Sequence, residues 1–419
     1  MMTPSSAVEF LIWLLIAASI IALLARRLRV PYTVSLVPGG VLLSALHLPI
    51  LSPLQAGNRP NWLTPDVILI VFLPTLVFEG SIKIDMRHLV KDFAPLLLLA
   101  NVSVLIATSV TGGLIHGAVG LPLVVALLFE SIISATDTIS GLAIFRKLKT
   151  VRRPALLIEG ESLLNDGTAV VLFEILLVGM VGGRLSVLRG IGQFCLAVAG
   201  GLVLGGVLGY LANKITATVN DAPIEITLTT ILAYGTYLLA GHLHLSGVIA
   251  TVAAGLVVGN FGFEKVMSAQ TRTAMLSFWE YAAFVINSLV FLLIGLEVRV
   301  SALLHAWRLV LFAIAAALIG RALSVYLLVP ASNLIAPKIS FRWQHAAVWG
   351  GLRGALALAL ALSLDSAFPF RSQILDMTFG VVICSILVQG LTMRPLLRFL
   401  KITGNEPNTF HDPAPASFP

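Results

Sequence analysis

Long apolar runs recur along the chain, and short polar or charged stretches separate them. One run near the N-terminus reads VEFLIWLLIAASIIALLA. A membrane-spanning helix needs about 20 apolar residues to cross ~30 Å of hydrocarbon. Strands of a membrane barrel would instead alternate apolar and polar positions over ~10 residues, and these runs do not alternate. The pattern therefore predicts α-helices that cross a membrane.

The apolar runs predict thirteen spans. Pro38 and two glycines interrupt the second span, and the junction near His242 is short, so a twelve-span count is the alternative. The predicted spans are 8–25, 31–47, 65–82, 93–116, 120–145, 154–182, 189–213, 224–242, 245–261, 271–297, 303–334, 342–364 and 372–400.

Basic residues fall mainly on one side of the predicted membrane. With the N-terminus outside, 19 of the 27 Lys and Arg residues lie in cytoplasmic connections and six lie on the opposite side. This excess is the positive-inside signal, and it predicts a cytoplasmic C-terminus. We expect a transmembrane domain over residues 1–402 and a short disordered tail over 403–419. An odd connecting span would invert the second half, so the expected fold is an all-α polytopic protein with two inverted six-helix repeats.

Composition agrees with a membrane protein. Hydrophobic residues make up 58% of the chain and charged residues 11%, against about 25% charged in a soluble domain. The net charge of +7 is explained by basic cytoplasmic loops, so we expect a lipid bilayer as partner and no nucleic acid. Cys195 and Cys384 lie inside apolar runs, where we expect small buried side chains and no disulfide.

The first polar motif inside a predicted span is SATDTISG, with Thr136 and Asp137. Asp137 precedes Arg146 by roughly 14 Å along a helix, which places it near mid-membrane. The stretch from Ser131 to Gly141 is rich in Ser, Thr and Gly, residues that weaken a helix interior. We expect a broken helix here, whose free carbonyls suit a cation.

The second motif, EGESLLNDGT, lies in the next span. Ser162 and Asp166 are four residues apart and share a helix face, while Glu161 and Asn165 share the adjacent face. Asp166 lies roughly 20 Å along the axis from Arg153, again near mid-depth. Ionisable residues at this depth are costly and mark function, and hard cations prefer oxygen ligands.

Two further motifs place charges at membrane depth. In GGLRGALAL, Arg353 needs a carboxylate partner; Glu161 is the preferred partner and Glu159 the rival. In VFEGS, Glu79 lies nearer the cytoplasmic end, which suits a vestibule or a snorkelling side chain. Weaker candidates are Glu130 and Glu174, which lack polar neighbours in sequence, and Arg321, expected to pair or snorkel near a helix end.

These motifs, taken together and in order, resemble the monovalent cation/proton antiporters, specifically the prokaryotic sodium/proton exchangers related to the animal exchangers. The resemblance rests on FEGS, SATDTISG, GESLLNDGTAVV, FWEYAAFVINSLVFLLIGL and GGLRGALALAL, and it spans about residues 8–400. It implies a homodimer of thirteen-helix protomers with unwound helices crossing at mid-membrane. It also implies a multi-pass protein of the cell inner membrane that transports ions, carries no cofactor and catalyses no covalent reaction.

The resemblance also implies roles for individual residues. Asp166 would bind either the cation or the proton, and Na⁺ (or Li⁺) would be held by Asp166, Asp137 and Ser162. The backbone of Thr136 would be a further ligand, and Glu79 would lie at the cytoplasmic approach. Asn165 would support the site, and Glu161 would form a structural ion pair with Arg353. Thr138 departs from the pattern, because relatives usually have Pro after the Asp.

A carboxylate that binds a proton or a cation, but not both, predicts coupled exchange by competition and alternating access. Because Asn165 stands where electrogenic relatives carry a second Asp, we expect electroneutral exchange. A K⁺/H⁺ antiporter on the same scaffold and a sodium-coupled symporter of organic anions are the alternatives. The sequence shows neither a pore loop nor a ring of carboxylates, as a channel would, nor a catalytic metal motif.

Overall fold

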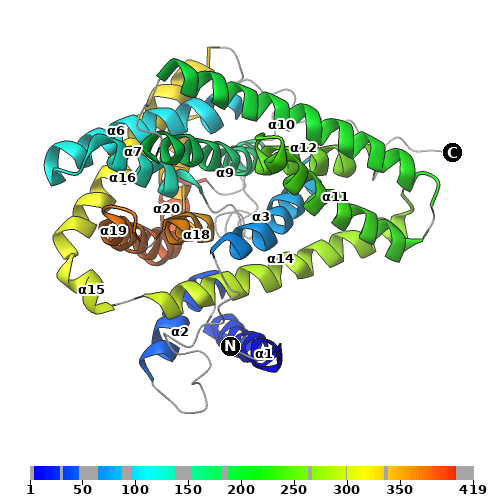
Figure 1. The fold of residues 1–419 in the computed structure, drawn as a ribbon, viewed down its shortest axis with the longest axis horizontal. Coiled ribbons are helices and arrows are strands. Elements are labelled where there is room, and N and C mark those ends of the chain that lie inside the picture. Colours follow the sequence, from blue (N-terminus) through cyan, green and yellow to red (C-terminus); the bar gives the residue numbers. More distant parts are fainter. Residues whose placement is uncertain are drawn as a thin grey trace.

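The computed structural model describes residues 4–28, 32–46, 65–86, 96–136, 152–181, 187–219, 221–262, 267–298, 300–334, 338–365 and 367–402. Apart from one isolated bridge, the regular structure of these residues is helical (Figure 1). The α-helices are α1 (Pro4–Leu28), α2 (Tyr32–Ala45), α3 (Pro65–Ile82), α6 (Ser103–Val119), α7 (Leu123–Ser134), α9 (Arg152–Val181), α10 (Val187–Thr216), α11 (Ala222–His242), α12 (Gly247–Val257), α14 (Ala269–Glu297), α15 (Val300–His305), α16 (Trp307–Ser332), α17 (Phe341–Gly350), α18 (Ala355–Ser363), α19 (Arg371–Cys384) and α20 (Gly390–Phe399). Three π-helical segments join them, η2 (Leu98–Val102), η3 (Val258–Gly262) and η4 (Ser385–Gln389).

The protein crosses the membrane many times. Within the described residues, eight helices are long and apolar enough to span a bilayer, and four shorter apolar helices accompany them. Each of the thirteen predicted spans overlaps at least one of the helices above. The expectation of an all-α polytopic fold is therefore confirmed. The orientation and the repeat symmetry stay predictions, and the expected tail over 403–419 lies outside the described residues.

The structure differs from the predicted spans where polar or small residues interrupt an apolar run. Within the described part of the span predicted over 120–145, α7 ends at Ser134, because Ala135 leaves the helical conformation with ψ at 128°. The span predicted over 342–364 splits into α17 and α18 around Gly351 and Gly354. The helix predicted over 303–334 begins as the separate short α15 before α16. Hydropathy predicts which segments lie in the membrane, but it does not predict where a helix is interrupted.

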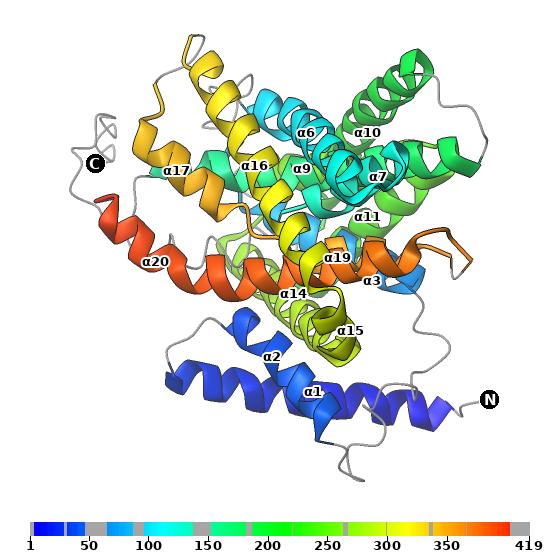
Figure 2. The ribbon, with the colours of Figure 1, turned by 90° about the vertical axis from the view of Figure 1, so that its left-hand side faces the viewer.

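The long helix α14 connects two groups of helices. At its C-terminal half it packs on α2, which lies beside α1 along one side of the molecule (Figure 2). A side chain on Gly295 would place its Cβ 2.3 Å from the Val37 carbonyl oxygen, so only glycine permits this close crossing. Elsewhere α14 packs on α3 and α11, which lie with α10 and α12 (Figure 1).

The interrupted helices meet at one point in the interior. Thr136, just beyond the end of α7, forms an isolated antiparallel bridge with Arg353, between α17 and α18. The Arg353 backbone N–H also donates to Ser385 Oγ at the start of η4, at 2.8 Å. Two unwound stretches thus lie side by side; the resemblance implied crossing unwound helices, but the sequence located only the first of the two. Unwound backbone at membrane depth needs such protein partners, because lipid offers none.

Candidate functional site

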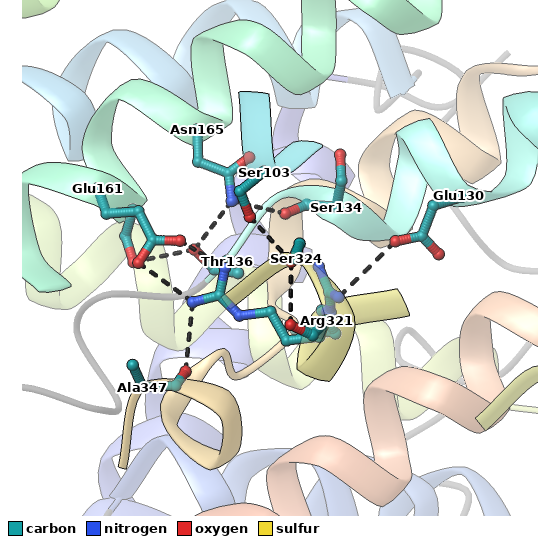
Figure 3. A network of polar contacts seen from close by, with 11 residues as sticks. Ser103, Glu130, Ser134, Thr136, Glu161, Asn165, Arg321, Ser324 and Ala347 are labelled. Atoms are coloured by element: carbon teal, nitrogen blue, oxygen red, sulfur yellow. Dashed lines mark hydrogen bonds and ion pairs between the residues drawn. The ribbon is translucent and has the colours of Figure 1, made fainter. Parts of the chain in front are cut away.

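A polar face of α9 lies against the unwound end of α7 (Figure 3). Thr136 Oγ1 donates to Ser162 Oγ at 2.9 Å. Asn165 Nδ2 donates to the Ser134 carbonyl at 2.8 Å and approaches Thr136 Oγ1 at 3.5 Å. Thr136, Ser162 and Asn165 are all buried. The structure therefore brings together three of the predicted site residues, one just beyond the end of α7 and two on α9.

The side chain of Asn165 caps the C-terminal end of α7. The last carbonyls of a helix have no partner within the helix, and the amide of Asn165 supplies one to Ser134. The supporting role that the resemblance implied for Asn165 stays a prediction, but this hydrogen bond gives it a physical basis. The hydroxyls of Thr136 and Ser162 then face each other beside the free end of the helix.

Asp166 follows Asn165 on α9 and is less buried than its neighbours. A half-buried carboxylate beside buried hydroxyls is suited to bind a hard cation. Asp137, the second predicted carboxylate ligand, and Thr138 lie outside the described residues. Asp137 follows Thr136 directly in the sequence, and Thr136 contacts Ser162, another of the predicted Na⁺ site residues.

Glu161 forms a buried ion pair with Arg321 on α16. The guanidinium contacts both carboxylate oxygens, with Nη2 to Oε2 at 3.1 Å, and Nη2 also donates to the Ala347 carbonyl at 3.2 Å. The prediction that Glu161 pairs with Arg353 is therefore wrong, and Arg321 lies in the interior and not at a helix end. The side chain of Glu159, the rival partner for Arg353, lies outside those described.

Gly351 leaves room for the Arg321 guanidinium. A Cβ on Gly351 would lie 2.9 Å from Arg321 Nε, so a larger residue would displace the guanidinium. Ser324, one helical turn further along α16, accepts a hydrogen bond from Ser103 Oγ at 3.1 Å. The break between α17 and α18 thus both exposes backbone and opens space for a buried charge.

Arg353 has a different acidic neighbour, Glu130 on α7. The distance from Arg353 Nη2 to Glu130 Oε1 is 3.8 Å, and Glu130 is fully buried (Figure 3). The sequence analysis ranked Glu130 low because its sequence neighbours are apolar. Its partner Arg353 is more than 200 residues away in the sequence, so the one available signal was an acid inside an apolar run.

Glu79 belongs to a separate cluster. Its carboxylate pairs with Lys83, which follows the last residue of α3, and Lys83 Nζ also lies 2.8 Å from Glu280 Oε1 on α14. Burial lowers the pKa of Lys83, but the two carboxylates outweigh this effect and raise the pKa above its ordinary value of 10.5. The structure connects Glu79 to α14 through Lys83, and the vestibule role stays a prediction.

The arrangement matches the chemistry of a monovalent cation site. Hydroxyl and carboxylate oxygens are the ligands that hard cations prefer, and they converge where one helix ends inside the protein. Two buried arginines each lie beside a glutamate. This pairing offsets the cost of burying both charges, and it leaves Asp166 as a carboxylate of α9 outside the two ion pairs.

Comparisons with known proteins decide the family. The description "Sodium/hydrogen exchanger, transmembrane" matches residues 14–399. The chain belongs to this family. The sodium/hydrogen exchanger family consists of transporters, in agreement with the expectation from the motifs.

Relatives of this exchanger chain cover most of its length. The Na⁺/H⁺ antiporter NhaG of Bacillus atrophaeus is 38% identical over 94% of this chain and 74% of its own. The Na⁺/H⁺ antiporter NhaH of Halobacillus dabanensis is 37% identical over 94% of this chain and 97% of its own. The sodium proton antiporter MjNhaP1 from Methanocaldococcus jannaschii shares the fold, with a TM-score of 0.75 at 21% identity, over 94% of this chain and 98% of that chain.

Proposed function

We propose that the protein is a secondary active antiporter that exchanges Na⁺ or Li⁺ for H⁺ across the cell inner membrane. The observation that carries the proposal is the buried group of oxygen ligands at the broken end of α7, next to Asp166. Membership of the sodium/hydrogen exchanger family and relatives named Na⁺/H⁺ antiporters support the same substrates.

Asp166 is the proposed site of competition. It binds either a proton or a Na⁺ ion, and Asp137, Ser162 and Thr136 complete the cation ligands. The empty, charged site cannot cross, whereas the loaded site switches access when one helical bundle moves against the other. Asn165 holds the broken helix and adds no second charge at this position. The exchange is therefore one Na⁺ for one H⁺, without net current.

The test is exchange by the purified protein in liposomes. A pH gradient is imposed and followed with a dye while Na⁺, Li⁺ or K⁺ is added, and a voltage-sensitive dye reports current in parallel. Na⁺ or Li⁺ should collapse the gradient without current, and Asp166→Ala should abolish the response. Thr230→Ala on α11, whose hydroxyl bonds only its own helix, is the control and should exchange normally.

Three other results of the liposome experiment would each change the proposal in a different way. A response to K⁺ alone would keep the mechanism but replace the substrate. Failure of every cation between pH 5 and pH 9, by folded protein, would contradict antiport and favour a symporter. A substantial current would contradict the one-for-one stoichiometry.

Association of two protomers into a homodimer belongs to the same proposal. It rests on the resemblance of the motifs to the antiporter family. A mass measurement of the protein in lipid nanodiscs at nanomolar concentration tests it, and a single-protomer mass would contradict it.

A further inference from the structure

The buried carboxyl group of Glu130 takes no part in the exchange site described above. Glu130 is 0% exposed, and neither of its carboxylate oxygens has a hydrogen-bond partner among the described residues. Its closest charged neighbour is the Arg353 guanidinium, 3.8 Å away. A buried carboxylate usually accepts several hydrogen bonds, because a buried charge without them is costly. One guanidinium is therefore the main support of the charged form of Glu130, and its apolar neighbours suit the protonated form.

The surroundings of Glu130 contain few other polar groups. Among the described residues, the charged groups that act on its carboxyl are Arg353 and Arg321, and Thr111 on α6 supplies the nearby hydroxyl. Thr111 Oγ1 donates to the Ala316 carbonyl at 3.2 Å, and Arg321 is engaged by Glu161. The helices α6, α9, α18 and α19 pack on α7. Their other ionisable side chains among the described residues are His116, Glu174, Asp166, Arg371, Asp376 and Cys384.

Arg353 connects Glu130 to the exchange site. Its backbone pairs with Thr136, whose hydroxyl contacts Ser162, and its N–H donates to Ser385. These backbone contacts hold Arg353 in place whatever the charge of Glu130. Arg353 as a whole is 5% exposed, so water compensates its charge only weakly. The protonation state of Glu130 therefore decides how much positive charge the exchange site experiences.

We propose that Glu130 binds a proton reversibly and, through Arg353, sets the affinity of the exchange site for its cation. Ionised Glu130 neutralises Arg353 and permits cation binding at Thr136, Ser162 and Asp166. Protonated Glu130 leaves the Arg353 charge uncompensated, and this charge repels the cation. Acid then weakens Na⁺ binding twice, once by competition at Asp166 and once through Glu130. The inference rests on the proposed function, and Glu130 acts in it as a positioning residue.

The test is the pH dependence of the apparent KM for Na⁺ in proteoliposomes, measured from pH 6 to pH 9. Glu130→Gln keeps the shape of the side chain and fixes it in the uncharged state. At alkaline pH its KM should exceed that of the wild type on the order of tenfold, as one uncompensated buried charge implies. Its KM should also rise less steeply toward acid pH, because one of two protonations is missing.

The control is Glu174→Gln, which removes a carboxylate of α9 that is exposed by its solvent-accessible surface. Its KM should follow the wild-type profile. If Glu130 only stabilises Arg353, Glu130→Gln will lower the melting temperature and the maximal rate, but its KM profile will remain parallel to that of the wild type. That result overturns the inference while wild-type exchange still supports the proposed function.

A second variant covers the case in which Glu130→Gln does not fold. Combining Glu130→Gln with Arg353→Met removes both charges and leaves no buried ion alone. Its KM at alkaline pH should lie within about threefold of the wild-type value, with the same shallow pH dependence expected of the single variant. A double variant that keeps the steep wild-type pH dependence would overturn the inference. Wild-type vesicles without Na⁺-dependent proton movement would instead overturn the proposed function and with it this inference.

Discussion

At the scale of single residues, the buried charges explain why this membrane protein tolerates ionisable groups in its interior. Glu161 and Arg321 form a bidentate pair whose guanidinium also bonds a backbone carbonyl. Such a pair contributes little net stability compared with apolar residues, but removing one partner leaves a charge that neither water nor protein satisfies. The two side chains therefore act as a unit.

We predict strong non-additivity for this pair. Glu161→Gln and Arg321→Met should each lower the free energy of unfolding by about 3–5 kcal/mol, because each strands a buried charge. The double variant should be more stable than either single variant. Thermal unfolding in detergent, followed by tryptophan fluorescence, measures the cycle, and additive losses would contradict a direct ion pair.

The partners of the buried charges could not be predicted from the sequence. The spacing of Arg353 and Glu161 along their own helices placed both near mid-membrane, and that depth suggested a pair. Depth along a helix does not tell which helices are neighbours. Arg321 lies close enough to Glu161 for a bidentate contact, and Arg353 lies beside Glu130 on α7. Partner choice depends on how four helices cross, which hydropathy and spacing do not encode.

At the scale of elements, broken helices position the site. Ser, Thr and Gly residues predicted the break after α7, and the structure confirms that the helix ends at Ser134. The break between α17 and α18 was not predicted, although Gly350, Gly351 and Gly354 surround it. Glycine in a membrane helix more often marks close packing than an interruption, so composition alone left this break hidden.

Gly351 tests the second break. Gly351→Ala should displace Arg321, since the added Cβ would lie 2.9 Å from Nε. We expect a lower melting temperature and at least a tenfold loss of Na⁺-dependent exchange, because the ion pair with Glu161 shifts. The matched control is Gly113→Ala on α6, where a Cβ meets nothing within 4 Å. This control should gain about 0.5–1 kcal/mol from helix propensity. Equal behaviour of the two variants would contradict the account of Gly351.

Lys83 joins α3 to α14 through Glu79 and Glu280. Its pKa is raised above 10.5 in the folded protein, so the link stabilises the fold fully below pH 10.5 and is lost as the pH rises through the folded pKa. Lys83→Gln should lower the free energy of unfolding at pH 8 by on the order of 1 kcal/mol, and the melting temperature should fall with it. This difference from the wild type should vanish above the folded pKa.

Lys214→Gln on α10 is the control for this comparison, because the Lys214 side chain is exposed. It should differ little from the wild type at any pH. A deficit of Lys83→Gln that stays constant into the most alkaline range would show that packing of its aliphatic chain, and not its charge, holds α3 to α14.

At the scale of the whole molecule, the sequence predicted the fold well. Apolar runs long enough to cross a bilayer are a strong signal, and the span predicted over 65–82 coincides with α3. Thr136, just beyond α7, lies within hydrogen-bonding distance of Ser162 on α9, and Asn165 of α9 approaches the same hydroxyl; their role as a cation site stays a prediction. The exposed apolar side chains of α1 and α10 are consistent with surfaces that face lipid.

The central claim is that a proton and a Na⁺ ion compete for Asp166. The most direct test adds Na⁺ to purified protein in weakly buffered detergent solution near neutral pH and records the protons released. The account predicts about one proton released for each Na⁺ bound, and no release from Asp166→Asn. Na⁺ binding without proton release by the wild type, or undiminished release by Asp166→Asn, would contradict it.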